Sequence, residues 1–196
     1  MRHFTKKQVD QWFNKSVVAD RKEFFFLKDV LQEYHVCRMA EIGVWKGTLA
    51  WFVMQNCPDV SEYWAIDPWR YMPSPDSQMD DYYRQLDICQ WNQAAFDTYC
   101  IMQTYPDRLH VIRLPSVEAA PLFTNEYFDC VFIDGDHSFE GMSSDLIAWH
   151  PKVKKGKLIC GDDIHRKSVK KAIQHIAPLT GFQYIEKSGL YWIGIA

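Results

Sequence analysis

The sequence predicts a single α/β domain, built as a three-layer sandwich with a largely parallel sheet between two layers of helices. Short apolar runs alternate with segments of helical periodicity along most of the 196 residues. Repeated β-then-α units of this length specify parallel strands whose connecting helices cover both faces of the sheet. With 47% hydrophobic residues, the chain can bury a core without disulfides. We therefore expect one domain over residues 1–196.

The expected elements follow one another without an internal repeat or linker. Residues 6–34 carry apolar side chains at helical spacing, which predicts one or two helices within the first 35 residues. Further helices are expected over 48–56 and 168–176. Strands are expected over 37–42, 63–66, 109–114, 128–133 and 158–160, and a hairpin around Ser188-Gly189 pairs 182–185 with 191–195.

Residues 69–90 form the least regular segment and are rich in Pro, Asp, Tyr and Met. A loop of this length inside a compact domain often has a function. Its apolar side chains would either cover a substrate as a lid or pack on one another at the surface: Trp69, Tyr71, Met72, Tyr82 and Tyr83. We expect this segment and the N-terminal helices to select the substrate.

Charge and composition disfavour several kinds of partner. The net charge of −3 implies no general attraction to nucleic acids or anionic membranes. No stretch approaches the roughly 20 apolar residues of a membrane span. Cys37, Cys130 and Cys160 are interpreted as buried free thiols of a reducing compartment, so a cytoplasmic location is expected. The basic stretch 152–171 is interpreted as a solvated surface, with a contact for an anionic partner as the alternative. A homo-oligomer remains open.

A glycine turn after the first strand is the first candidate binding motif. Gly43 would let a ligand approach the backbone, and Gly47 precedes the helix expected over 48–56. The start of that helix suits a carboxylate, and Glu41 suits a cationic amino group. Asp67, at the end of the second strand, can accept hydrogen bonds from both ribose hydroxyls of an adenosine ligand. The glycine spacing differs from G-x-G-x-x-G, which argues against NAD.

Four carboxylates follow the fourth and fifth strands, which should be neighbours. Such carboxylates repel one another unless they are protonated or joined by a cation, and Mg²⁺ takes oxygen ligands. His137 lies among them, and its ordinary pKa near 6.5 suits proton transfer. The alternative is that these residues cap the helices that follow them. The four acids are Asp134, Asp136, Asp162 and Asp163.

With these motifs the chain resembles the class I methyltransferases that use S-adenosylmethionine (SAM), over nearly its whole length. The likeness rests on E-I-G-x-x-x-G at 41–47, I-D-P-W at 66–69, F-I-D-G-D-H-S-F-E at 132–140 and G-D-D at 161–163. The resemblance implies a Rossmann-like, seven-stranded sheet with one antiparallel strand in its last hairpin. It implies SAM as the cofactor and Ser116 near the adenine. The expected SAM-binding residues are Glu41, Gly43, Gly47, Asp67, Ser116 and Asp134.

The metal-dependent O-methyltransferases of the catechol and the sugar or macrolide types suggest catalytic roles by position. Carried over, their metal ligands are Asp134, Asp162 and Asp163. Catechol-type enzymes have Lys three residues after the first Asp, where this chain departs with His137. Related sugar enzymes have an Asp two residues after it, which Asp136 matches. Both residues are candidates for the base.

The sequence thus predicts a SAM-dependent methyltransferase that methylates a hydroxyl of a small molecule, such as a sugar or polyol, with the help of Mg²⁺. The metal would orient the hydroxyl and lower its pKa. One alternative is a metal-independent methyltransferase in which His137 acts alone. Another is a non-catalytic SAM-binding module that contacts a partner through the basic stretch. A nicotinamide oxidoreductase is disfavoured by the glycine spacing.

Overall fold

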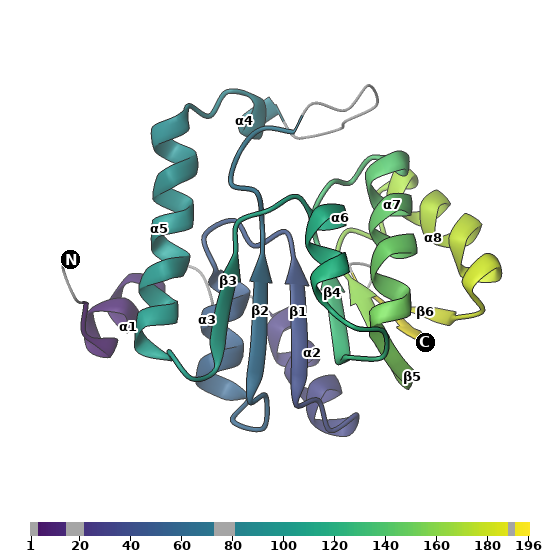
Figure 1. Ribbon diagram of the computed structural model, residues 1–196, viewed down its shortest axis with the longest axis horizontal. Helices are drawn as coiled ribbons and strands as arrows, with labels where there is room; N and C mark the ends of the chain where they lie inside the picture. Colours follow the sequence, from purple (N-terminus) through teal and green to yellow (C-terminus); the bar gives the residue numbers. More distant parts are fainter. Residues whose placement is uncertain (1–3, 15–21, 73–80, 188–190) are drawn as a thin grey trace.

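A single seven-stranded sheet runs through the protein, with helices on both faces (Figure 1). The structure is a computed structural model that describes residues 4–14, 22–72, 81–187 and 191–196. The strand order is β3-β2-β1-β4-β5-β7-β6. Strands β1 to β5 are parallel, and β7 is antiparallel to both of its neighbours. The strands are β1 Arg38–Ile42, β2 Glu62–Ile66, β3 Leu109–Ile112, β4 Phe128–Ile133, β5 Val153–Gly161, β6 Gln183–Lys187 and β7 Tyr191–Ile195.

Two hydrophobic clusters, one on each face of the sheet, make the three layers. The first lies against α1, α2, α3 and α5, and the second lies against α6, α7 and α8. Because side chains alternate along a strand, β1 contributes Met39 to the first cluster and Ala40 to the second. The predicted α/β fold is confirmed. The helices are α1 Lys6–Asn14, α2 Lys22–Glu33, α3 Thr48–Asn56, α4 Asp81–Arg84, α5 Ile88–Thr104, α6 Ser116–Ala119, α7 Phe139–Trp149 and α8 Lys167–Thr180.

Several predicted boundaries differ from the structure. The strand predicted over 158–160 is only the end of β5, which pairs with β4 from Val153 onward. The first half of β5 is rich in lysine and resembles a loop in composition, so the sequence does not predict it as a strand. The irregular segment predicted over 69–90 ends early, because α5 starts behind the capping residue Asp87. The turn predicted at Ser188-Gly189 lies outside the described residues.

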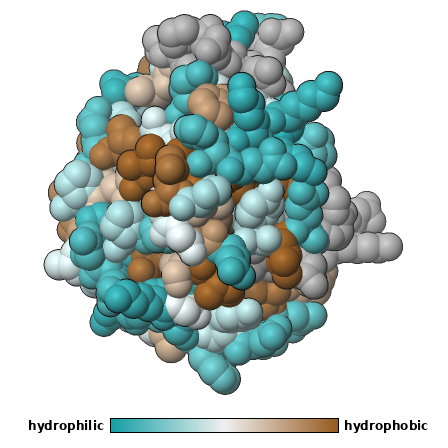
Figure 2. Space-filling model, turned by 90° about the vertical axis from the view of Figure 1, so that its right-hand side faces the viewer, coloured by the Kyte–Doolittle hydropathy of each residue, from teal (hydrophilic) through white to brown (hydrophobic). Residues whose placement is uncertain are grey.

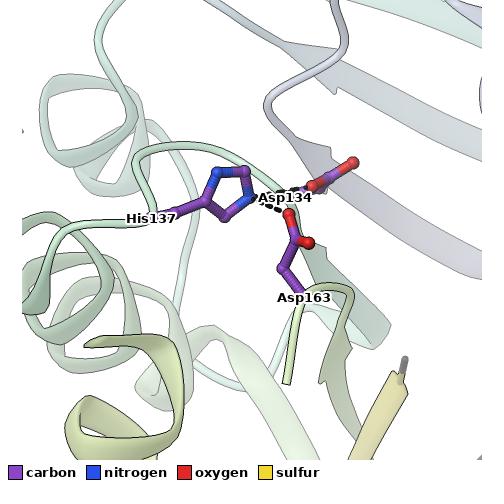
Figure 3. Close-up of side chains that lie close together, drawn as sticks. All are labelled: Asp134, His137 and Asp163. Atoms are coloured by element: carbon purple, nitrogen blue, oxygen red, sulfur yellow. Dashed lines mark hydrogen bonds and ion pairs between the residues drawn. The ribbon is translucent and has the colours of Figure 1, made fainter. Parts of the chain in front are cut away.

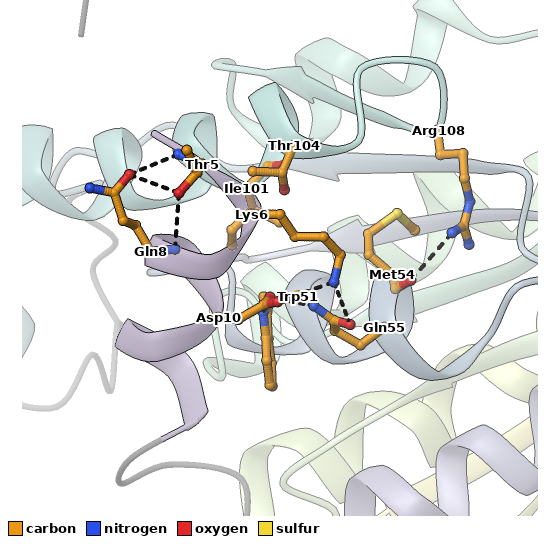
Figure 4. A network of polar contacts seen from close by, with 10 residues as sticks. All are labelled: Thr5, Lys6, Gln8, Asp10, Trp51, Met54, Gln55, Ile101, Thr104 and Arg108. Carbon is orange, nitrogen blue, oxygen red and sulfur yellow. Dashed lines mark hydrogen bonds and ion pairs between the residues drawn. The ribbon is translucent and has the colours of Figure 1, made fainter. Parts of the chain in front are cut away.

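Helix α1 is bound to α3 by hydrogen bonds around Asp10 (Figure 4). The Asp10 carboxylate accepts hydrogen bonds from Trp51 Nε1 at 3.0 Å and from the Gln55 side chain, and it pairs with Lys6 at 3.1 Å. In Figure 1, α1 lies beside the lower part of α5, whereas the carboxyl ends of the central strands point upward. This part of the N-terminal segment therefore lies away from the strand ends that carry the predicted site residues.

The basic stretch 152–171 makes many of its contacts within the protein. Lys154 pairs with Asp129 at 2.8 Å, Lys157 donates to the Tyr34 carbonyl at 2.6 Å, and Lys170 pairs with Glu186 at 2.8 Å. These contacts spread the lysines over β5 and α8 and offset part of their charge. They support the interpretation of the stretch as a solvated and paired surface.

Apolar side chains are exposed on α7, α8 and β6, namely Ile147, Leu179 and Ile185. Figure 2, which shows the right-hand side of Figure 1, has brown areas divided by hydrophilic side chains.

Cys37, predicted to be buried, is exposed because it precedes β1 at the amino edge of the sheet. Among the described residues, no helix combines the length and apolar character that a membrane crossing requires.

Candidate active site

The predicted site residues gather at the carboxyl ends of four neighbouring strands. Glu41 lies in β1, Asp67 follows β2, Asp134 follows β4 and Asp162 follows β5. The strand order places β2, β1, β4 and β5 side by side, so their carboxyl ends share one edge. Open α/β sheets bind their ligands at such an edge.

The two glycines after β1 are required by packing within the chain. Gly43 has a φ of 85°, and a Cβ built there would lie 2.2 Å from the Asp134 carbonyl oxygen. Gly47 has a φ of 75°, and its Cβ would lie 2.8 Å from Ile101 Cδ1 on α5. From the sequence, we expected these glycines to be needed because a ligand approaches the backbone. In the structure, the neighbouring backbone and side chains of the protein already leave no room for a Cβ at either position.

Asp67 joins the turn after β1 to the turn after β2. Its Oδ2 accepts hydrogen bonds from the backbone N–H groups of Val44 at 2.8 Å and Trp45 at 3.0 Å, and its Oδ1 accepts from Trp69 N–H at 2.6 Å. A carboxylate has about four acceptor positions, so about one remains here. Both ribose hydroxyls of a bound adenosine could therefore reach Asp67 only if a backbone N–H gave way. Burial raises the pKa of Asp67, and these three hydrogen bonds oppose that shift.

The same turns hold two tryptophans in left-handed backbone conformations. Trp45 has a φ of 53° and Trp69 a φ of 43°. Such residues cost on the order of 1–3 kcal/mol each and are often found at functional sites. Trp69 is fully buried and donates from Nε1 to the Trp45 carbonyl at 2.7 Å. Trp69 is thus part of the scaffold of the turn and not of a surface lid.

Glu41 is buried and bound within the protein. Its Oε2 accepts a hydrogen bond of 2.6 Å from the Tyr63 hydroxyl on β2. Burial raises the pKa of Glu41 well above its usual range, and the nearby charges of Asp134 and Asp67 raise it further. From the sequence, we expected this carboxylate to bind an amino group of the ligand. The structure adds Tyr63 as a partner that the sequence did not indicate.

Asp134, His137 and Asp163 form a compact group beyond β4 and β5 (Figure 3). His137 Nε2 lies 3.2 Å from Asp134 Oδ1 and 2.9 Å from Asp163 Oδ2. Burial alone would lower the pKa of His137, but the hydrogen bonds and charges of the two carboxylates raise it to about 10. His137 and Arg166 together overcome the effect of burial on Asp163 and lower its pKa to about 2. The three side chains can each offer one metal-ligand atom, all within 4.8 Å of one another.

The other two predicted acids each accept a hydrogen bond from a nearby backbone N–H. Asp162 accepts the backbone N–H of Asp163 at 2.6 Å, and burial and the charge of Asp134 raise its pKa to about 7. Asp136 accepts the Ser138 N–H at 2.9 Å and lies against Gly141 in the first turn of α7. Ser138 caps α7 by accepting the Gly141 N–H at 3.0 Å. The structure thus gives Asp136 the helix-starting contacts that were the alternative to a catalytic role.

Ser116 leads to a buried acid that the sequence interpretation missed. Its hydroxyl accepts a hydrogen bond from Trp149 Nε1 at 2.7 Å and lies near Asp145, whose pKa it lowers. Burial, with a contribution from Asp136, raises the pKa of Asp145 to about 7. The signal in the sequence is that Asp145 lies on the apolar face of α7, between Met142 and Leu146. The hydrogen bond from Trp149 occupies one acceptor position of the Ser116 hydroxyl.

This arrangement of a parallel sheet, a glycine turn after β1 and acids after β2, β4 and β5 is that of the SAM-dependent methyltransferases. Residues 40–164 match a family described as a methyltransferase domain, and the chain belongs to that family. No curated protein sequence matches this chain.

Solved structures share its fold at low sequence identity. Cofactor-bound Rv0187 from MTB is 14% identical, with a TM-score of 0.65 over 95% of this chain and 85% of the other. An O-methyltransferase from Bacillus cereus in complex with SAH is 14% identical, with a TM-score of 0.62 over 97% and 89%. An SAH-bound methyltransferase from Podospora anserina is 12% identical, with a TM-score of 0.64 over 96% and 86%.

Proposed function

We propose that the protein transfers a methyl group from SAM to a hydroxyl oxygen of a small molecule. The observation that carries this proposal is the concentration of buried carboxylates beside the glycine turn of a methyltransferase domain. Burial raises the pKa of Glu41 and Asp162, and the charge of Asp134 raises both further. The acids at this edge of the sheet therefore lie close enough to repel one another when they are ionised.

A cationic cofactor suits such an edge. SAM brings a positive sulfonium and a positive ammonium group, whereas NAD brings a negative pyrophosphate that these acids would repel. We place the adenosine over the turns fixed by Asp67 and α6, and the methionyl end towards Glu41 and Asp134. The structural neighbours with bound cofactor or SAH support the same choice.

For the acceptor, we propose a hydroxylated molecule such as a sugar or polyol. Aromatic side chains lie beside the glycine turn, with the Trp45 ring centroid 5.1 Å from that of Tyr83 and 6.1 Å from that of Tyr82. Tyr82 is 56% exposed, so part of this cluster offers apolar surface to a ligand. Of the segment 69–90, we keep residues 70–72 and α4 as the candidate substrate segment.

We further propose that Asp134 and Asp163 hold a divalent cation. Their oxygens come from neighbouring strand ends, and carboxylates are the donors that hard cations prefer. When bound, such a cation would lower the pKa of the acceptor hydroxyl and orient its oxygen. Methyl transfer needs an accurately placed nucleophile, because the thioether leaves as a neutral group.

Isothermal titration with SAM and SAH tests the proposal. We expect one molecule of SAM or SAH to bind per chain and no comparable binding of NAD. Asp67→Ala should weaken SAM binding at least about tenfold, because the turn after β1 loses its fixed shape. The control Asp59→Asn, on an exposed residue before β2, should bind SAM normally. Folded protein that binds neither SAM nor SAH would contradict the proposal.

A further inference from the structure

We propose that His137 is a protein ligand of the cation, and that the site therefore prefers a transition-metal ion such as Mn²⁺ to Mg²⁺. This inference rests on the metal-assisted form of the proposed function. It replaces the role of base that the sequence suggested for His137, and it replaces the expected preference for Mg²⁺.

Two carboxylate oxygens lie close to the Nε2 atom of His137. His137 Nε2 faces two carboxylate oxygens at once, Asp134 Oδ1 at 3.2 Å and Asp163 Oδ2 at 2.9 Å. A single N–H would have to be shared between these two oxygens, whereas a cation can bind both of them and the nitrogen. Two adjacent ligands about 2.1 Å from an octahedral cation lie about 3.0 Å apart. The two distances at His137 Nε2 fit neighbouring ligands around one ion as well as they fit hydrogen bonds.

Neighbouring basic side chains orient the carboxylate of Asp163. Arg166 Nε lies 3.2 Å from Oδ1, the oxygen that does not face His137, and His165 Nε2 lies 3.5 Å from that same oxygen. Oδ2 is thus the oxygen turned towards the shared centre (Figure 3). Groups around a metal ligand that fix its orientation in this way are typical of built metal sites.

The chemistry of the donor set favours a transition-metal ion. Mg²⁺ favours oxygen ligands, whereas imidazole nitrogen suits ions such as Fe²⁺, Ni²⁺ and Zn²⁺. A set of two carboxylates and one imidazole therefore suits a first-row transition-metal ion better than Mg²⁺. Mn²⁺ is the weakest binder of that row, so a preference for Mn²⁺ over Mg²⁺ is the strictest test. Nε2 is also the atom that a base would use, so a metal bound there removes His137 as the proton acceptor.

Electron paramagnetic resonance with Mn²⁺ tests this assignment directly. The probe is Mn²⁺ added to folded protein that carries no affinity-tag histidines. We expect bound Mn²⁺ to show electron spin-echo modulation from one directly bound ¹⁴N nucleus. In competition experiments, Mg²⁺ should displace Mn²⁺ only at a clearly higher concentration.

Two matched variants separate His137 from its neighbour. His137→Gln keeps a polar side chain with an oxygen donor, and it should abolish the nitrogen signal. It should also weaken Mn²⁺ binding about tenfold or more, with a smaller effect on Mg²⁺. His165→Gln changes a 53% exposed side chain near the same carboxylate, so it should keep the nitrogen signal and weaken Mn²⁺ binding less than His137→Gln does. Circular dichroism and SAM titration establish that each variant is folded.

The outcomes distinguish the inference from the function on which it rests. Mn²⁺ bound without nitrogen coupling, or a coupling that persists in His137→Gln, would overturn the role of His137 but leave a cation site. If neither Mn²⁺ nor Mg²⁺ bound to protein that still binds SAM, the metal-assisted mechanism and this inference would both fail. Loss of SAM binding by the unmodified protein would instead contradict the proposed function itself.

Discussion

Single carboxylates have different roles at the amino and carboxyl ends of the sheet. At the amino end, Asp129 accepts hydrogen bonds from the backbone N–H groups of Cys37 and Arg38, at 3.0 and 2.9 Å, and pairs with Lys154 at 2.8 Å. Burial alone would raise the pKa of Asp129, but these contacts lower it overall. At the carboxyl end, burial raises the pKa of Glu41 and Asp162, and the charge of Asp134 raises both further. The first pattern stabilises the fold, whereas strongly perturbed carboxylates of the second kind are common at functional sites.

Asp129→Asn should therefore destabilise the protein in a pH-dependent way. Because the folded pKa is depressed, the stabilisation by the carboxylate is fully present above the unfolded value and is lost as the pH falls through the folded one. At pH 7 the variant should lose about 1.5–3 kcal/mol, since a part-buried lysine contact and two N–H contacts to the charged carboxylate are weakened. Urea unfolding at pH 7 and below pH 4 measures this difference. An equal difference at both pH values would contradict the account.

At the scale of elements, the turn between β1 and α3 is defined by its contacts with the strand next to it. Gly43 combines a positive φ with a close approach to the backbone of Asp134 and Gly135, and its N–H donates to the Ile66 carbonyl at 2.9 Å. One small residue thus brings together the ends of β1, β2 and β4. Any shift of this turn would also move Asp134.

Gly43→Ala should cost about 3 kcal/mol or more, because left-handed strain and a backbone clash add together. Gly156→Ala is the matched control, since Gly156 also has a positive φ but a Cβ there would meet no atom within 4 Å. That control should cost about 1–2 kcal/mol. Thermal and urea unfolding of both variants give the comparison. Equal losses would mean that the contact with β4 has no energetic role.

At the scale of the whole molecule, the sequence predicts where the acids lie but not which of them meet. The parallel sheet follows from the alternation of strands and helices, and Asp67 and Asp134 could be placed at its carboxyl edge because each follows a strand. Asp162 and Asp163 are neighbours in sequence, yet only Asp163 reaches His137. Asp163 has a left-handed φ of 61°, and Asp162 accepts its N–H. Turn geometry of this kind has no periodic signal in the sequence.

Partners from distant parts of the chain are also hidden in the sequence. Glu41 meets Tyr63 because the register pairs Met39 with Tyr63 and Glu41 with Ala65, which places the two side chains on the same face. Only the assembled sheet fixes that register. The sequence therefore predicts the class of ligand better than it predicts the contacts each acid makes before the ligand binds.

SAM should lie across the turn at Gly43, at the acidic edge of the sheet. A crystal structure of the protein with bound SAH tests it most directly. We predict the SAH ribose beside Asp67, with at most one of its hydroxyls on that carboxylate unless the Trp69 N–H is displaced, and its amino group towards Glu41 and Asp134. SAH bound elsewhere on the molecule, with this edge of the sheet unaltered, would contradict the account.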